Sequence, residues 1–433
     1  MKKFTPKKFL FVSWESLSGD LAWQAKKEGN KVKVYIKIKR DQDVFDGFVD
    51  KVNNWEKEVD WADVVIFDDV GFGKWADALR KKGKLVIGGS IYTDKLEGSR
   101  EFGQAEMKKA GMVVLPHWDF SDFNLAIRFL RKNPGRYVFK PNYGVGEGLD
   151  LHDLLFLGEQ ENGKDILEML ETNKKLLKSQ IKSFQLQRFA GGVEMAVGAF
   201  FNGEDFIHPI NVNFEHKRLF PGELGPFTGE MGTLMYWSKP NTLFNNTLAR
   251  MTDSLRKSGY VGYIDINCIV NERGIFPLEF TSRFGYPTIN IQLEGILTPA
   301  GEFLYRLANK EKFELKTKTG FQVGIVACLT PYGTGHYSDI FVYRNMSILF
   351  RKPNPKLEGI HLGDVKLING QLRVAGASGY VLIVTGAGQT VEEAREQAYD
   401  RIGNIRMQNM FYRNDIGMRW FKERGKLKTW GYL

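Results

Sequence analysis

The chain has 433 residues, of which 43% are hydrophobic and 26% are charged. A chain of this length exceeds what one hydrophobic core supports, so we expect about two to four domains. No run of about 18 apolar residues occurs, which excludes a transmembrane helix. Both cysteines, Cys268 and Cys328, lie in apolar runs. This placement is typical of buried thiols in a reducing compartment, without disulfides or a zinc site, and predicts a cytoplasmic protein.

The formal charge of +10 and the isoelectric point near 9.2 predict an acidic partner. Nucleotide phosphates, nucleic acid and an anionic membrane surface all fit such a charge. The densest basic clusters, residues 31–40 and 421–430, are more typical of solvated strand and tail faces, and no nucleic-acid motif accompanies them. Nucleic acid therefore stays an alternative partner that no motif supports.

The first hundred residues alternate apolar strands with helical stretches. Strands are expected near 8–14, 31–36, 62–69 and 84–89, and helices near 19–29 and 73–83. This alternation predicts βαβ units and a parallel sheet. A single helix is expected over 94–110, then a break at 111–116 and an amphipathic helix over 121–133.

Residues 184–285 are strand-rich, with β-hairpins expected over 194–210 and 262–280. The stretch 312–320 is the expected linker. After it, apolar strands at 321–329 and 379–388 and a helix at 390–405 predict a small α/β terminal domain.

A strand ending in Lys140 leads into a loop with glycines at 144, 146 and 148. A lysine and exposed backbone N–H groups can close over phosphates. The loop is neither a Walker A loop nor a dinucleotide fingerprint, because the glycines follow the lysine and no helix opens there. An ordinary hairpin turn is the alternative.

Oxygen-bearing side chains alternate along the second hairpin. Asp265 and Asn267 share one face of its first strand, and Glu279 and Thr281 share one face of the second. If the strands pair in the simplest register, up to three oxygen ligands converge, as Mg²⁺ on nucleotide phosphates requires. An exposed sheet face would show the same alternation.

His216, Lys217 and Arg218 precede a glycine-rich stretch that ends at residue 232. Such a turn after a basic triplet can hold an anionic intermediate. A histidine beside two cations is also common on a solvated face.

Several stretches in this order resemble the glycinamide ribonucleotide synthetase (phosphoribosylamine–glycine ligase) family of the ATP-grasp superfamily, over nearly the whole chain. They are LEGSREF (96–102), VFKPNYGVGEG (138–148), RFAGGVEMAVGAFFNGE (188–204), EHKRLFPGELGPFTGEMG (215–232), LEFTSRFGYP (278–287) and the C-terminal block 388–420. The last block is typical of this family rather than of ATP-grasp enzymes in general.

The resemblance implies an α/β and α+β chain with the ATP-grasp fold. It implies a flavodoxin-like domain over 1–93, an ATP-grasp domain over 94–312 with a lid at about 120–190, and a small C-terminal α/β domain over 313–433. The implied cofactors are ATP and Mg²⁺ or Mn²⁺. The implied partners are small molecules, namely ATP, an amino acid such as glycine and an amine acceptor, with no membrane; no oligomeric state is implied.

The resemblance also implies a role for each matching residue. Glu279 and Asp265, with Asn267, would hold the metal ion, and Arg283, Lys217 and Arg218 would act in catalysis. The residues expected to bind ATP are Lys140, Gly144, Gly146, Gly148, Gln187, Arg188, Ala190, Glu194 and Arg100. The residues expected to bind the other substrates are His216, Thr228, Gly229, Met231 and Gly232.

The chain departs from the family pattern at several positions. Thr281 stands where the family has asparagine, and Gln104 where it has a phosphate-supporting lysine, which leaves Arg100 as a substitute. The larger departures fall on the acceptor side, at residues 13–20 (SWESLSGD), 285–288 (GYPT) and 377–380 (ASGY).

The expected activity is ligation of a carboxylate to an amine through an acyl phosphate, with glycine and phosphoribosylamine of purine synthesis as the leading pair. A related ligase joining an amino acid to another amine, on a nucleotide or a modified base, is the first alternative. A nonenzymatic nucleotide-binding descendant is the second.

Overall fold

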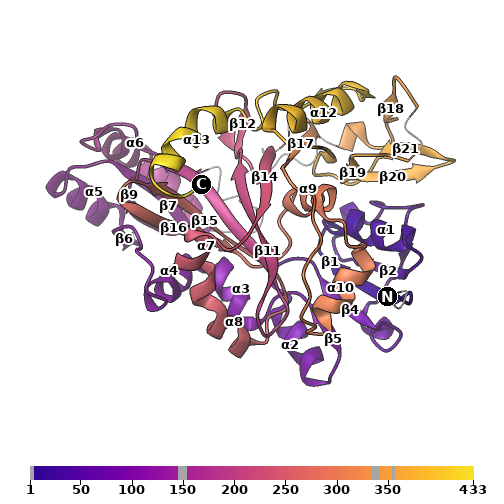
Figure 1. Ribbon diagram of the computed structural model, residues 1–433. Coiled ribbons are helices and arrows are strands. Elements are labelled where there is room, and N and C mark those ends of the chain that lie inside the picture. Colours follow the sequence, from indigo (N-terminus) through magenta and orange to yellow (C-terminus); the bar gives the residue numbers. More distant parts are fainter. Residues whose placement is uncertain (1–3, 145–153, 331, 333–340, 354–355) are drawn as a thin grey trace.

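The computed structural model describes residues 4–144, 154–330, 332, 341–353 and 356–433 (Figure 1). Glycines 146 and 148 of the predicted phosphate loop lie outside these residues. Among the described helices, none is long and apolar enough to cross a membrane.

The N-terminal part is a parallel sheet with helical crossovers, as the alternating pattern predicts. Its described strands run in the order β3-β2-β1-β4-β5, and every pairing is parallel. The elements are β1 (Lys8–Ser13), α1 (Gly19–Lys27), β2 (Lys31–Ile36), η1 (Lys39–Asp41), β3 (Asp50–Lys51), η2 (Glu56–Glu58), β4 (Val64–Phe67), α2 (Gly73–Lys81) and β5 (Leu85–Ile87). The order reverses between β1 and β4, and ligands of such sheets bind at the carboxyl ends of the strands flanking that point.

The single helix expected over 94–110 is wrong. Two helices, α3 (Ile91–Gly98) and α4 (Arg100–Lys109), meet at Ser99, which has an extended backbone. The Ser99 hydroxyl accepts a hydrogen bond from the N–H of Phe102 and so caps α4. Serine after glycine favours a new helix start over continuation, because its side chain satisfies an N–H that the first turn leaves unpaired.

A smaller antiparallel sheet, the lid sheet, follows in the order β6-β9-β7-β8. Its elements are β6 (His117–Phe120), α5 (Phe123–Lys132), β7 (Tyr137–Gly144), β8 (Phe156–Leu157), α6 (Lys164–Gln180) and β9 (Ile181–Arg188). This part has its own hydrophobic core, in which Phe184 of β9 packs against both Phe139 of β7 and Phe123 of α5. Figure 1 shows it on the opposite side of the central sheet from the N-terminal sheet.

The central sheet of the described chain has nine strands, eight of them in the order β16-β15-β10-β11-β14-β17-β22-β19, with β24 paired to β17. Its part before the expected linker comprises β10 (Val193–Phe201), β11 (Phe206–Glu215), β12 (Arg218–Phe220), β13 (Leu224–Phe227), β14 (Gly232–Ser238), α7 (Thr242–Asn246), η4 (Leu248–Met251), α8 (Thr252–Ser258), β15 (Gly262–Asn271), β16 (Gly274–Thr281), α9 (Thr288–Gly295) and α10 (Ala300–Ala308). The strands β12 and β13 form a separate hairpin.

The C-terminal part continues this sheet, because β17 pairs with β14 on one side and with β22 on the other. Its elements are β17 (Phe321–Leu329), η5 (Phe341–Tyr343), β18 (Leu349–Phe350), β19 (Ile360–Leu362), β20 (Val365–Ile368), β21 (Gln371–Val374), β22 (Tyr380–Gly388), α12 (Val391–Gly403), β23 (Ile405–Arg406), β24 (Met410–Phe411) and α13 (Arg419–Thr429). Helix α12 lies close on β22 at Gly386, where an added Cβ would stand 2.4 Å from the Ala394 carbonyl oxygen.

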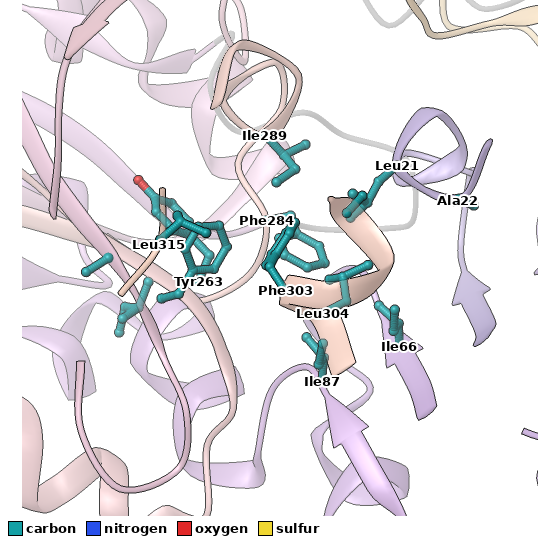
Figure 2. Close-up of a cluster of buried hydrophobic side chains, with 14 of the residues drawn as sticks. Leu21, Ala22, Ile66, Ile87, Tyr263, Phe284, Ile289, Phe303, Leu304 and Leu315 are labelled. Carbon is teal, nitrogen blue, oxygen red and sulfur yellow. The ribbon is translucent and has the colours of Figure 1, made fainter. Parts of the chain in front are cut away.

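Helix α10 joins the N-terminal sheet to the central sheet. Figure 2 shows Phe303 and Leu304 of this helix between Ile87 of β5 on one side and Phe284 and Tyr263 on the other. Phe303 and Leu304 are both almost fully buried. This apolar layer sets the distance between the two sheets, and with it the position of the loops that end the N-terminal strands.

We expect Phe303→Ala to lower the free energy of unfolding by about 3–5 kcal/mol, because it removes a buried ring and leaves a cavity. Leu297→Ala is the matched control, since Leu297 is exposed and its change should stay within about 0.5 kcal/mol. Urea unfolding followed by fluorescence and by circular dichroism measures both values. Equal stabilities of the two variants would contradict a joining role for this layer.

Candidate functional site

A cavity of about 360 Å³ lies where α3 and α4 face β7 and β16. Its lining includes Arg100 and Gln104 of α4, Asn142 of β7, and Glu279 and Arg283 at the end of β16. The cavity therefore brings the lid sheet, the α3–α4 turn and the edge of the central sheet around one space.

The hairpin of β15 and β16 pairs in the expected register. Asp265 stands opposite Thr281 and Asn267 opposite Glu279, and a β-bulge follows at Asn267 and Cys268. Because side chains alternate, all four project from the same face of the sheet. The two strands therefore pair in the register on which the predicted metal site depends.

The donor set on this face fits a hard divalent cation. Asp265 is buried, and its Oδ1 has no hydrogen-bond partner among the described residues. Burial, and next the nearby Glu215, raise the pKa of Asp265 well above its usual value, while the Thr281 hydroxyl donates a hydrogen bond to it. A buried carboxylate oxygen beside amide and carboxylate oxygens is the environment in which Mg²⁺ is held.

Lys217 meets three carboxylates from the central sheet. Its Nζ lies 3.0 Å from Glu279 Oε1, 3.5 Å from Glu215 Oε2 and 3.6 Å from Glu194 Oε1. Burial alone would lower the pKa of Lys217, but the carboxylates, Glu279 foremost, raise it well above its usual value. Lys217 is therefore a permanent cation beside the expected metal ligands.

Lys140 is the cation on the lid side. It lies on β7 opposite Gln185 of β9. Burial, and next the neighbouring Arg100, lower the pKa of Lys140 to about 8, and Glu279 and Glu194 act in the opposite direction. The carboxylates Glu279 and Glu194 of the central sheet are therefore close enough to stabilise the charge of Lys140.

Arg100, rather than Gln104, supplies a charge from α4. The Arg100 guanidinium donates to the Pro141 carbonyl oxygen at 2.9 Å and to Asn142 Oδ1 at 2.6 Å, directly after Lys140. Gln104 is buried, and its side-chain amide forms a reciprocal pair with that of Gln185, at 3.0 Å in each direction. The residue at the family's lysine position is thus engaged in an amide pair.

Arg283 is held by two carboxylates that sequence reasoning missed. Its Nε lies 3.0 Å from Asp69 Oδ1, after β4, and 3.1 Å from Glu97 Oε1 of α3. The backbone N–H of Ser282 also donates to Glu97. Glu97 belongs to the LEGSREF stretch, which supports the family resemblance, but the resemblance gave no role to Glu97. Glu215 could have been found from the alternation of Asn211, Asn213 and Glu215 along β11.

The connection from β9 to β10 joins the lid sheet to the central sheet. Gln187, near the end of β9, is buried, and its Nε2 has no hydrogen-bond partner among the described residues. The Arg188 guanidinium lies 4.3 Å from the centre of the Tyr137 ring and donates to the Pro134 carbonyl oxygen. Arg188 and Ala190 also line a second cavity of about 580 Å³.

Two other expected site residues, His216 and Arg218, are not among the residues that line the 360 Å³ cavity, and they bond to neighbouring protein groups. His216 is fully buried, with Nδ1 2.7 Å from Glu223 and Nε2 accepting from the Gly417 N–H at 3.0 Å. Arg218 stacks on Phe227 at 3.6 Å and donates to the Gly225 carbonyl oxygen. The expectation that His216 and Arg218 face the reacting groups is therefore not supported by their contacts.

The glycine-rich stretch after Lys217 folds back on it. The Thr228 hydroxyl donates to the Lys217 carbonyl oxygen at 2.9 Å. Met231 is buried among apolar side chains, which argues against direct substrate contact by its side chain. Gly232 begins β14 opposite Ile325, while Gly229 has open space around its Cα.

Two family models match the chain. The phosphoribosylglycinamide synthetase ATP-grasp (A) domain matches residues 98–289, and the C domain of the same synthetase matches residues 344–419. A curated phosphoribosylamine–glycine ligase of Lactococcus lactis is 24% identical over 357 residues, which are 79% of this chain and 80% of that protein.

Solved structures share the fold. A phosphoribosylamine–glycine ligase of Thermotoga maritima has a TM-score of 0.69 at 21% identity, covering 95% of this chain and all of that one. The biotin carboxylase domain of a Hydrogenobacter thermophilus 2-oxoglutarate carboxylase, described as a complex with MgADP, has a TM-score of 0.60 at 14% identity, covering 95% of this chain and 92% of that one. These likenesses confirm the expected ATP-grasp fold. The ATP-grasp model and the C-domain model together match more than half of the residues, so the chain is an ATP-grasp protein that is similar to the phosphoribosylglycinamide synthetases in both of these parts.

Proposed function

We propose that the chain is an ATP- and Mg²⁺-dependent ligase that joins a carboxylate to an amine, with glycine and phosphoribosylamine as the leading pair. The single observation that carries the proposal is that Arg100, Glu279 and Arg283 line one cavity. Lys140 and Lys217 interact electrostatically with Glu279, and Asp265 stands on the strand beside it. The names of the family and of the curated relatives support the same chemistry.

In this reaction a carboxylate oxygen attacks the γ-phosphorus of ATP, which releases ADP and forms an acyl phosphate. The amine nitrogen then attacks the acyl carbon, phosphate leaves, and the nitrogen loses a proton. Lys140 and Arg100 would bind the nucleotide phosphates, and Arg283 would stabilise the charge that moves from the γ-phosphate to the acyl phosphate. Glu279, Asp265 and Asn267 would hold Mg²⁺, which neutralises phosphate charge when bound.

A second candidate, ligation to a different amine, is favoured by two buried aspartates, Asp68 and Asp364, that contact the stretches departing from the family pattern. In the departing stretches, the Ser18 hydroxyl donates to Asp68 at 2.7 Å and the Ser378 hydroxyl donates to Asp364 at 2.8 Å. Burial raises the pKa of both carboxyls to about 7. Tyr286 of the GYPT stretch donates to the Asp68 carbonyl oxygen at 3.1 Å. Above about pH 7 these carboxyls are mostly ionised, and negative charge beside the departing stretches disfavours a phosphorylated amine and suits a cationic one.

We expect ADP release to require both an amino acid and an amine, and to be measurable with glycine and phosphoribosylamine generated in the assay. A coupled ADP assay with a panel of amino acids and of neutral, cationic and phosphorylated amines tests this. Release only with other pairs selects the second candidate. ATP binding without release for any pair selects a nonenzymatic nucleotide-binding protein.

Lys140→Ala should weaken ATP binding by about 10- to 100-fold, the effect of losing one charge-assisted hydrogen bond. Lys132→Ala, on the exposed end of α5, should bind ATP like the wild type. Because ATP binds the protonated lysine, and the pKa of Lys140 is about 8, kcat/KM for ATP should fall as the pH rises above about 8. Lys140→Arg should shift this fall to higher pH. Unchanged ATP affinity of Lys140→Ala in a calorimetric titration would remove the residue from the site.

Glu279→Gln and Asp265→Asn should each lower kcat by at least about 100-fold and raise the Mg²⁺ requirement, because each removes a ligand charge with little change in size. Thr281→Asn, which restores the family residue, should leave kcat unchanged or lower the Mg²⁺ concentration for half-maximal rate. Glu272→Gln in the exposed turn of the same hairpin is the control. Mg²⁺ titrations of ADP release compare the four variants, and wild-type curves for Glu279→Gln and Asp265→Asn would refute the metal site.

A further inference from the structure

The C-terminal segment Arg413–Arg419 contacts the backbone on both sides of Lys217. We propose that this segment positions Lys217 for the reaction, with Arg413 and Arg419 as its positioning residues. The proposal rests on the ligase function proposed above, and neither arginine is expected to touch substrate.

Arg413 is the largest fully buried side chain of the described residues, and all of its nitrogens are engaged. Its Nη1 donates to the Arg218 carbonyl oxygen at 2.8 Å, and its Nη2 donates to Glu223 Oε1 at 2.6 Å. Nε and Nη2 also donate to the two oxygens of Asp415, both at 2.8 Å. Asp415 in turn accepts from the Gly222 N–H at 2.9 Å. One buried guanidinium thus ties the segment to both the start and the turn of the β12–β13 hairpin.

His216, on the other side of Lys217, belongs to the same network. The Gly417 N–H donates to His216 Nε2, so Nδ1 carries the proton and donates to Glu223 at 2.7 Å. Burial lowers the pKa of His216, although Glu223 acts against this. His216, Glu223 and Asp415 are close enough to hold a metal ion. The Arg413 guanidinium, however, lies within 3.1 Å of all three and takes the place of an ion.

Arg419 reaches the strands that supply the carboxylates around Lys217. Its Nη1 donates to the Glu215 carbonyl oxygen at 3.0 Å and its Nη2 to the Glu194 carbonyl oxygen at 3.3 Å. The side chains of the same two residues lie 3.5 and 3.6 Å from Lys217 Nζ. Arg419 therefore fixes the backbone of two partners of Lys217, while Arg413 fixes Arg218 and, with Gly417, His216.

This arrangement determines where the Lys217 ammonium lies. A buried ammonium among carboxylates is stable only in good geometry, and a displacement of about 1 Å from a reacting group can cost about 100-fold in rate. The segment is distant from Lys217 along the chain, since His216 and Arg413 are 197 positions apart. The C-terminal part thus contributes to the site by placing one cation rather than by adding a reacting group.

Arg413→Gln and Arg419→Gln test the proposal against Arg401→Gln. Arg401 of α12 is an arginine of the C-terminal part that is as exposed as Arg419, at 18% against 20%. Its Nη1 donates to the Thr385 carbonyl oxygen of β22 at 2.7 Å. We expect the first two variants to lower kcat by about 100-fold with KM for ATP within about twofold of wild type. Arg401→Gln should keep both constants. Thermal melts identify any variant that fails to fold, and Arg419→Gln carries the test if Arg413→Gln is one of them.

A second readout does not depend on turnover. Acetic anhydride labelling, quantified by mass spectrometry, reports how accessible the Lys217 ammonium is, relative to exposed Lys132. If Arg413 and Arg419 hold the backbone around Lys217, their loss should free the Lys217 side chain from its place among the carboxylates. Lys217 labelling should then rise above the wild-type extent in Arg413→Gln and Arg419→Gln, and not in Arg401→Gln. Wild-type labelling in both folded variants would overturn the proposal. Absence of turnover in the wild type with every substrate pair would instead refute the ligase function, and labelling would still decide the position of Lys217.

Discussion

The site depends on the compensation of several negative charges by one ammonium group. Glu194, Glu215 and Glu279 come from β10, β11 and β16, three of the four neighbouring strands at one end of the central sheet. Carboxylates at this spacing repel one another strongly when partly buried. Lys217 allows them to stay together, so it lets the same sheet face present acidic ligands to a metal and a cation to phosphates.

The two sides of the cavity belong to parts with separate hydrophobic cores. The lid sheet supplies Lys140 from a core built around Phe139 and Phe184, whereas the carboxylates stand on the main core. Arg100 bridges the two parts by bonding to the backbone beyond Lys140. Nucleotide phosphates would therefore lie between groups whose distance is set by a few polar contacts rather than by one packed interior.

Local features of this fold could be predicted from the sequence, and long-range ones could not. Period-two alternation placed Asp265, Asn267, Glu279 and Thr281 on one face, because a tight hairpin leaves little freedom in register. The helix break at Ser99 was missed because the apolar pattern continues through it. Whether the helix continues or starts again at Ser99 depends on the hydrogen bond by which its side chain caps α4. Motifs located Lys217, Glu194 and Glu279, but not Glu215, the contacts among these groups or the Arg413 network, because these contacts join residues from distant strands. Nothing local in Arg413 distinguishes it from the many exposed arginines of the chain.

The pairing of β14 with β17 also bears on how the chain can be divided. On its outer side, Gly232–Tyr236 of β14 pairs with Phe321–Ile325 of β17. A fragment ending near the expected linker at 312–320 would present β14 as a bare strand edge in the middle of what is now a continuous sheet. Unprotected edges of this kind recruit strands from other molecules. We therefore expect the ATP-grasp part to self-associate when it is separated from the C-terminal part, because β17 covers the edge of β14 in the whole chain.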